Sequence, residues 1–258
     1  MNDVRITHEG HVGIAEICRA PNNFFDKELI GELAAAFKGF AADDNIRSIL
    51  LCAEGKNFCA GANFSRPASE TVGSRMEDRD TDHLYRQAVQ LFRCTKPIVA
   101  AVQGAAVGGG LGLSLVADFR VATAESRFTA NFNRLGFHPG FGLSVTLPRV
   151  VGVQQATLLF YTGRRITGEE AHKIGLVDVL APNDGLRAAA LALATEIAQS
   201  APVAVQSTRA TLRKGLADAV EAATTHELAE QQVHFAMADF AEGVKAMAER
   251  RLPNFTGR

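Results

Sequence analysis

The chain has 258 residues, of which 47% are hydrophobic and 21% charged, and its formal net charge is −1. These proportions are those of an ordinary globular protein and exclude a disordered, collagen-like or coiled-coil chain. Lys and Arg nowhere form a run longer than a pair, so the sequence predicts neither a nucleic-acid nor a membrane-surface partner.

The cysteines and one long uncharged segment bear on the cellular compartment. The four cysteines form no CxxC pair and have no histidine at ligand spacing, which predicts free thiols, a reducing cytoplasmic environment and no zinc site. Residues 97–117 carry no charge and are long enough to span a bilayer, but five glycines interrupt them. We therefore expect a buried strand, a tight turn and a buried helix there, and no membrane partner.

In chain order, the first elements are strands and one helix. Residues 4–7 and 12–18 are apolar runs separated by a short polar turn, which predicts a β-hairpin. Asp26 is placed to cap a helix whose apolar positions follow a 3.6-residue period. Residues 46–52 then predict a buried strand.

The middle of the chain begins with a polar segment, residues 65–82, which we interpret as a surface loop. Residues 83–94 carry a helical pattern. A strand, a helix and a second strand are expected at 98–102, 111–116 and 119–123.

Beyond about residue 142 the pattern is almost wholly helical. Helices are predicted over 186–197, from Pro202 onward, and over 216–236 and 239–250. The sequence therefore predicts an α/β protein with a β/α core over residues 1–195 and a helical C-terminal region over residues 196–258.

Several catalytic signatures are absent. The chain lacks the GxSxG of hydrolases, the GxxxxGK[ST] of phosphate-binding loops and the GxGxxG of dinucleotide sites. His226-Glu227 does not open a zinc motif, because Glu230 stands where HExxH needs its second histidine. We therefore expect no separate cofactor and no metal.

Two glycine-centred turns remain, FCAGANF at residues 58–64 and GAAVGGGLGL at residues 104–113. Each follows an apolar strand, and the second leads into a helix. Small residues allow a ligand to approach the backbone, and two N–H groups that converge on one oxygen form an oxyanion hole. The alternative is that the glycines only permit tight packing between strand and helix.

Five separated motifs together resemble the enoyl-CoA hydratase/isomerase, or crotonase, superfamily over nearly the whole chain. They are IRSILLCAEGKNFCAGANF, TKPIVAAVQGAAVGGGLGLSLVADFRVA, LGFHPGFG, TGRRITGEEAHKIGLVDVL and EGVKAMAERRLPNFTGR. The resemblance implies a spiral of ββα units with a C-terminal helical region. It also implies a homotrimer or a dimer of trimers, a role in fatty acid metabolism, and acyl-CoA substrates whose coenzyme A is part of the substrate.

The resemblance also implies roles for individual residues. The two amides that hold the thioester oxygen would be those of Ala62 and Gly109, with the neighbouring Gly108 and Gly110 in the same binding turn. Ala60 would contact the adenine of coenzyme A, and Lys56 would lie beside the nucleotide. An enolate oxygen held in this way makes the proton next to the thioester removable.

The sequence lacks a carboxylate at three positions where members of this family carry one: hydratases have glutamate at two of them, and some isomerases have aspartate at the third. These three positions are Gly112, Phe132 and Gly140, none of which can move a proton. General acid–base catalysis supplies about 10²–10⁴ in rate, so ordinary two-glutamate hydration is not expected. The same replacements suggest a bulky or flat acyl group.

Other residues near these positions are candidates for the missing chemistry. His138 is either a proton carrier or a loop histidine, since imidazole titrates near neutral pH. Asn131 could hydrogen-bond a substrate or satisfy a turn. Asp82, His83 and Tyr85 are interpreted as a helix cap and a solvated face, although some relatives place catalytic side chains there.

The sequence thus predicts an acyl-CoA enzyme that stabilises an enolate or oxyanion. Decarboxylation, hydrolysis, isomerisation and atypical hydration all remain open. The alternative is a catalytically silent acyl-CoA carrier or sensor that has kept the pocket and lost the acid–base pair.

Overall fold

The structure, a computed structural model, describes residues 3–64 and 84–258, so the predicted loop at 65–82 lies outside the described residues. Its main sheet has the strand order β1-β2-β3-β4-β6-β9. The first two strands pair antiparallel as the predicted hairpin, and the remaining neighbours pair parallel. The strands are β1 Val4–Glu9, β2 Val12–Ile17, β3 Ser48–Ala53, β4 Ile98–Val102, β6 Phe119–Ala122 and β9 Val179–Leu180.

The central strands are buried on both faces. In β3, Ile49 and Leu51 belong to one hydrophobic core, while Leu50 and Cys52 belong to another on the opposite face. This alternation follows from the two-residue period of a strand, and parallel sheets are covered on both sides in this way. The α/β fold class is therefore confirmed.

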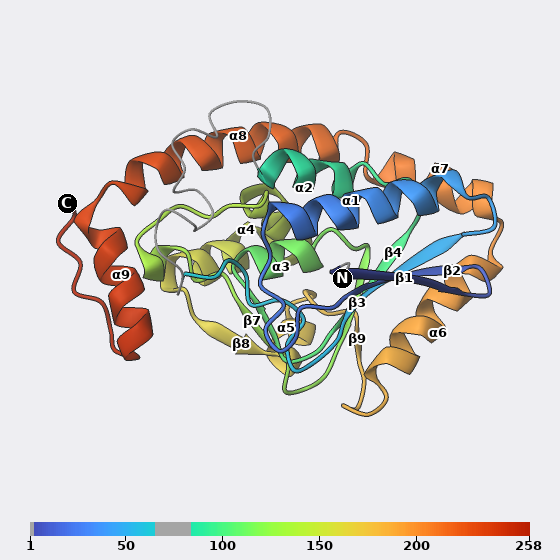
Figure 1. Cartoon of the computed structure of the whole chain (residues 1–258), viewed down its shortest axis with the longest axis horizontal. Coiled ribbons are helices and arrows are strands. Elements are labelled where there is room, and N and C mark those ends of the chain that lie inside the picture. The colour runs from blue at the N-terminus through green and yellow to red at the C-terminus, as the bar shows by residue number, and fades with distance from the viewer. Residues whose placement is uncertain (1–2, 65–83) are drawn as a thin grey trace.

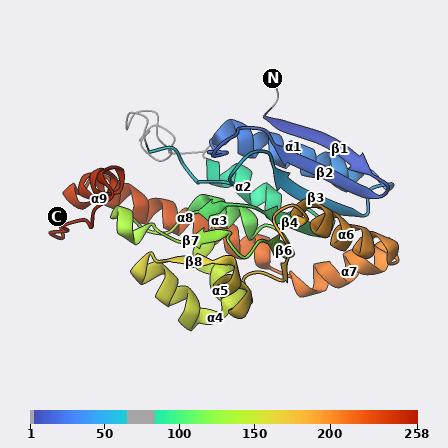
Figure 2. The same cartoon turned by 90° about the horizontal axis from the view of Figure 1, so that it is seen from below.

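Helices cover both faces of the sheet (Figure 1). α1, α2 and α8 lie on one side, and α6 packs against the other. The helix α9 lies at the far end of the molecule from α6, near the C-terminus (Figures 1 and 2). The helices are α1 Lys27–Ala42, α2 Leu84–Phe92, α3 Gly109–Ser114, α4 Leu143–Thr162, α5 Gly168–Lys173, α6 Leu186–Gln199, α7 Pro202–Leu212, α8 Leu216–Phe235 and α9 Ala238–Glu249.

Local sequence signals place several of these helices correctly. The Asp26 carboxylate accepts a hydrogen bond from the Leu29 N–H at 3.0 Å, so it caps α1 as predicted. Pro202 is the first residue of α7, where its missing N–H breaks no helical bond. The uncharged stretch 97–117 forms β4 and α3 as predicted, with a further short strand, β5 Ala105–Val107, between them. Among the helices of the described part, none alone is long and apolar enough to cross a membrane; only α6 and α7, bent by 106°, pass that test as a pair.

A second, smaller sheet was not expected. It consists of β5 Ala105–Val107, β7 Arg127–Thr129 and β8 Arg165–Thr167, in that order. The expectation of almost only helix beyond residue 142 is wrong at β8 and β9, which are three and two residues long. Strands this short show no alternating pattern, and their tertiary partners define them.

Asp118 ties the C-terminal helices to the core. Its carboxylate accepts hydrogen bonds from Arg209 and Arg213, both at 2.8 Å, and from the Ile98 N–H at the start of β4. Arg209 is 9% exposed, so its charge is largely removed from water. The ion pairs of Asp118 are thus a buried link between α7 and the sheet.

Replacing Asp118 by Ala is expected to lower the free energy of unfolding by about 3–5 kcal/mol, because two guanidinium groups lose their shared buried counter-charge. Denaturant unfolding would measure the loss. The matched control is Asp218→Ala, whose side chain is 77% exposed and lies 3.3 Å from Arg93; a change below about 1 kcal/mol is expected there. Equal effects of the two substitutions would contradict the assigned role of Asp118.

Candidate active site

Backbone hydrogen bonds hold the two glycine-centred turns side by side. The Cys59 N–H donates to the Ala105 carbonyl, and the Val107 N–H donates to the Cys59 carbonyl, both at 3.0 Å. A Cβ on Gly61 would lie 2.6 Å from the Val107 oxygen, and one on Gly110 would collide with the Cys59 carbonyl. Glycine is therefore needed at both positions, and Gly61 also has a φ of +81°. The packing role of these glycines is confirmed.

The same arrangement leaves two amides without an acceptor. Ala60 donates its N–H to the Asn22 carbonyl at 2.9 Å, and Gly108 donates to the Thr129 carbonyl at 2.8 Å. For Ala62 and Gly109, no described residue accepts the N–H; Gly109 is the first residue of α3, where helical N–H groups have no partner within the helix. Both residues line one cavity. Their amides are thus available to a ligand there.

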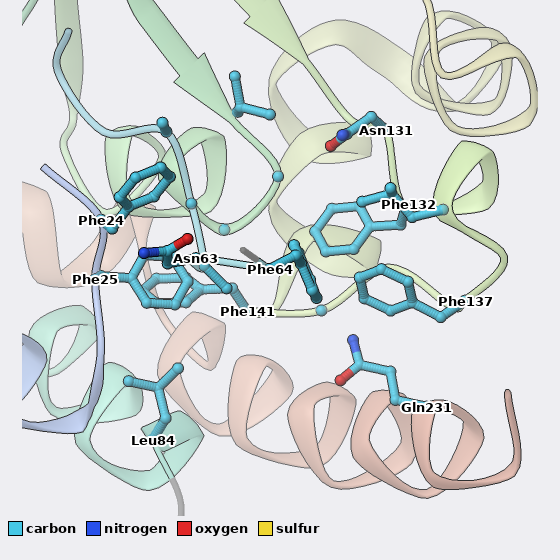
Figure 3. A pocket seen from close by; sticks show the side chains of 18 of the residues that line it. Phe24, Phe25, Asn63, Phe64, Leu84, Asn131, Phe132, Phe137, Phe141 and Gln231 are labelled. Atoms are coloured by element: carbon cyan, nitrogen blue, oxygen red, sulfur yellow. The ribbon is translucent and has the colours of Figure 1, made fainter. Parts of the chain in front are cut away.

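Seven phenylalanines and Tyr85 are among the residues that line that cavity, which has a volume of about 230 Å³ (Figure 3). Leu84, Leu135 and Met247 add further apolar surface. Among the described lining residues there is no Asp, Glu, His, Lys or Arg. The phenylalanines are Phe24, Phe25, Phe64, Phe132, Phe137, Phe141 and Phe235, and the polar side chains are those of Asn63, Tyr85, Asn131 and Gln231.

The space next to Gly112, where a carboxylate was absent from the sequence, is occupied by another side chain. A Cβ on Gly112 would lie 2.8 Å from the Phe141 ring. The ring centroids of Phe141 and Phe25 are 5.5 Å apart. The absence of a side chain at Gly112 is therefore coupled to the presence of an aromatic ring at residue 141.

The other two positions without carboxylates, Phe132 and Gly140, are in the cavity lining. Phe132 packs against Phe137 at 5.4 Å between ring centroids. A Cβ on Gly140 would collide with the Tyr85 hydroxyl and the Gln231 amide nitrogen. The uncharged polar side chains of Tyr85 and Gln231 thus occupy the space into which a side chain at residue 140 would extend.

A buried carboxylate supports this part of the wall. Glu227, on α8, accepts hydrogen bonds from the Gly142 N–H at 2.7 Å, the Ser144 N–H at 3.0 Å and the Ser144 hydroxyl at 2.6 Å. Burial raises the pKa of Glu227, and its hydrogen bonds with Ser144 and Gly142 oppose that rise. Phe141 has a φ of 63°, a left-handed conformation that costs a bulky residue about 1–3 kcal/mol. Glu227 stabilises the turn that places the Phe141 ring.

Sequence reasoning considered Glu227 only as part of a failed zinc motif. A carboxylate on the buried face of a predicted helix was the signal that could have identified it. Among the described residues, no group of three or more His, Cys, Asp or Glu side chains could hold a metal ion.

The predicted site residues divide into those that line the cavity and those that do not. Tyr85 is 7% exposed and lines the cavity, so its interpretation as part of a solvated face is wrong. Asp82 and His83 lie outside the described residues. The predicted residues in the cavity lining are Ala60, Ala62, Gly108, Gly109, Asn131, Phe132 and Gly140; Lys56, Gly110, Gly112 and His138 are not among the lining residues.

His138 is not among the residues that line the cavity. Its Nδ1 is 2.8 Å from the Pro139 carbonyl oxygen, and its ring contacts that of His226 at a centroid distance of 5.7 Å. The candidate proton carrier is therefore outside the described lining. Lys56 is exposed at the surface.

Comparisons with known proteins extend over the whole chain. The family described as Enoyl-CoA hydratase/isomerase matches residues 9–258. A protein named probable enoyl-CoA hydratase from Bacillus subtilis is 30% identical over 262 residues, covering 100% of both chains. The 1,2-epoxyphenylacetyl-CoA isomerase of Escherichia coli is 29% identical over 92% of this chain and 91% of its own. The crystal structure of an enoyl-CoA hydratase/isomerase from Pseudoalteromonas atlantica superimposes with a TM-score of 0.87 at 30% identity, over 98% of this chain and 100% of that chain.

Replacing Gly112 by Ala is expected to lower the free energy of unfolding by about 1–3 kcal/mol, because the added methyl group is forced against the Phe141 ring. In a Phe141→Ala background the same change should have a much smaller effect. Gly31→Ala is the control, because a Cβ there meets no atom within 4 Å; it should stabilise α1 by about 0.5–1 kcal/mol. Thermal unfolding would measure all of these variants, and an equal loss at Gly112 with and without Phe141 would refute the coupling.

Proposed function

The chain belongs to the enoyl-CoA hydratase/isomerase family, and we propose that it is an enzyme that holds the thioester oxygen of an acyl-CoA between the Ala62 and Gly109 amides. One observation supports this proposal: Ala62 and Gly109, on two neighbouring turns, both line one cavity, and no described residue accepts their N–H groups. When a proton or another group leaves the carbon next to a thioester, negative charge moves to the thioester oxygen. Each preorganised donor to such an oxygen contributes about 10²–10³ in rate.

The cavity supports a reaction that does not depend on a pair of carboxylates. Residues 112, 132 and 140 carry no proton-transfer group, and Phe141, Tyr85 and Gln231 fill the space near two of them. We therefore propose an isomerisation, decarboxylation or hydrolysis of the acyl group in preference to two-glutamate hydration. The aromatic lining favours a bulky or flat acyl group. The similarity to a relative named for a phenylacetyl-CoA derivative agrees with this choice.

The coenzyme A portion would extend from the cavity past the first turn. Ala60 lines the cavity, and Lys56 is exposed four residues earlier. We propose that the Ala60 backbone contacts the adenine and that the Lys56 ammonium lies beside the nucleotide phosphates, where the two charges attract.

Removing either amide should weaken the polarisation of a bound thioester. A proline at 109 is unsuitable, because a side chain there would collide with the Phe25 ring. Replacement of Ala62 by lactic acid, or of Gly109 by glycolic acid, puts an ester oxygen in place of the N–H and leaves the side chain unchanged. With ¹³C-labelled phenylacetyl-CoA, the wild-type protein should lower the carbonyl stretching frequency, and each ester variant should restore much of the free value.

The control for this infrared experiment is lactic acid at Ala60, whose N–H is already bonded to Asn22. That variant should lose stability and keep the full carbonyl shift. An unchanged shift in both the Ala62 and the Gly109 variant would refute the proposed oxyanion hole.

Turnover separates an enzyme from a silent carrier. We expect the wild-type protein to convert at least one member of a panel of aryl and branched acyl-CoA thioesters, and the Gly109 ester variant to lower kcat/KM by about 10²–10³. Product formation would be followed by mass spectrometry between pH 5 and 9. Tight binding of the thioesters with no product at any pH would favour the carrier.

A further inference from the structure

Gln231 is a buried amide that the cavity wall only partly satisfies. It extends from α8 into the cavity below Phe132 and Phe137 in Figure 3, and it is 2% exposed. The Tyr85 hydroxyl donates to its Oε1 at 2.9 Å, and its Nε2 donates to the His138 carbonyl at 2.9 Å. A glutamine amide has two N–H groups and two acceptor lone pairs. One N–H and one lone pair of Gln231 are therefore unused by the described residues.

The surroundings of Gln231 make this unused capacity informative. Four phenylalanines, Phe132, Phe137, Phe141 and Phe235, line the same cavity, and their rings carry no oxygen or nitrogen that could pair with the amide. A purely hydrocarbon acyl group would expel water and leave the amide unsatisfied, which is unfavourable for a buried polar group. An oxygen atom on the acyl group would instead accept the free N–H, and a hydroxyl could also donate to Oε1.

The partners of Gln231 fix its orientation. Tyr85 lies at the start of α2, and its hydroxyl also interacts with the backbone of Phe141. Burial and the nearby Glu227 carboxylate raise the pKa of Tyr85, so the hydroxyl is protonated at neutral pH and remains a donor. Because that donor occupies Oε1, the Gln231 nitrogen is held toward the His138 carbonyl. The remaining N–H is thus presented in a fixed direction.

The charges near the pair restrict which oxygen fits. Glu227 is the carboxylate close to Tyr85, and within the described lining there is no Lys, Arg or His to balance a second negative charge. A carboxylate on the acyl group would be repelled and left without a counter-ion. A neutral oxygen meets no such penalty.

We propose that Gln231, oriented by Tyr85, recognises an uncharged oxygen on the acyl group, so that the substrates are bulky acyl-CoA thioesters bearing a hydroxyl, carbonyl or ether oxygen. This inference rests on the proposed acyl-CoA function and adds a substrate class to it. Gln231 is a binding residue in this account, and Tyr85 is a positioning residue that acts through it.

Binding of matched ligands tests the proposal in the wild-type protein. The probes are 4-phenylbutanoyl-CoA and its 2-hydroxy, 3-hydroxy and 4-oxo derivatives, with dissociation constants measured by calorimetry under conditions where chromatography shows each ligand unchanged. At least one oxygenated derivative should bind about tenfold more tightly than the parent, which corresponds to about 1.4 kcal/mol. If 4-phenylbutanoyl-CoA binds and none of its derivatives binds more tightly, the inference is overturned and the proposed function remains intact. Failure of all four ligands to bind would overturn both.

Three variants test whether Gln231 and Tyr85 cause the tighter binding of the oxygenated derivative. Gln231→Leu should raise the dissociation constant of the preferred derivative about tenfold and leave that of the parent within twofold. Tyr85→Phe keeps the shape of the wall and frees Oε1, and should reduce the preference at least threefold; this variant decides the question if Gln231→Leu fails to fold. The matched control is Gln232→Leu, at the exposed neighbouring position on α8, which should change nothing. A preference that persists in Tyr85→Phe and in folded Gln231→Leu would overturn the assignment.

Discussion

Close backbone contact between two turns is the constraint on which the rest of the site depends. The segment around Cys59 pairs with β5, and the carbonyls of Val107 and Cys59 lie where side chains at Gly61 and Gly110 would otherwise be. Only residues without Cβ atoms allow this approach. Because the turns meet in this way, Ala62 and Gly109 both lie in the lining of one cavity. The contacts that require glycine are therefore also the contacts that bring the two residues of the proposed oxyanion hole together.

The missing carboxylates are replaced by a different, internally consistent wall. Phe141 occupies the space beside Gly112, and the Tyr85–Gln231 pair occupies the space beside Gly140. The left-handed conformation of Phe141 is maintained by Glu227, whose carboxylate accepts hydrogen bonds from the turn that follows. Restoring one carboxylate would thus require several neighbouring changes.

The C-terminal helices contribute to the site as well as to the packing. α8 supplies Gln231 to the cavity and Glu227 to its supporting turn, and α7 is joined to the core through Asp118. The sequence predicts a helical region that packs on the core. None of the predicted site residues lies in that region, because helical periodicity indicates which face is buried and does not indicate what that face covers.

By itself, the sequence determined the α/β class, the main strands and helices, the family, the two glycine turns and the absence of carboxylates at residues 112, 132 and 140. These features depend on local periodicity, on caps such as Asp26 and on motifs read along the chain. Only the tertiary structure decided that His138 is not in the cavity lining, that Tyr85 is buried, and that Gln231, 146 residues after Tyr85, lines the same cavity. Contacts between residues so distant depend on how helices pack across the sheet, and a one-dimensional pattern does not encode that geometry in any single segment.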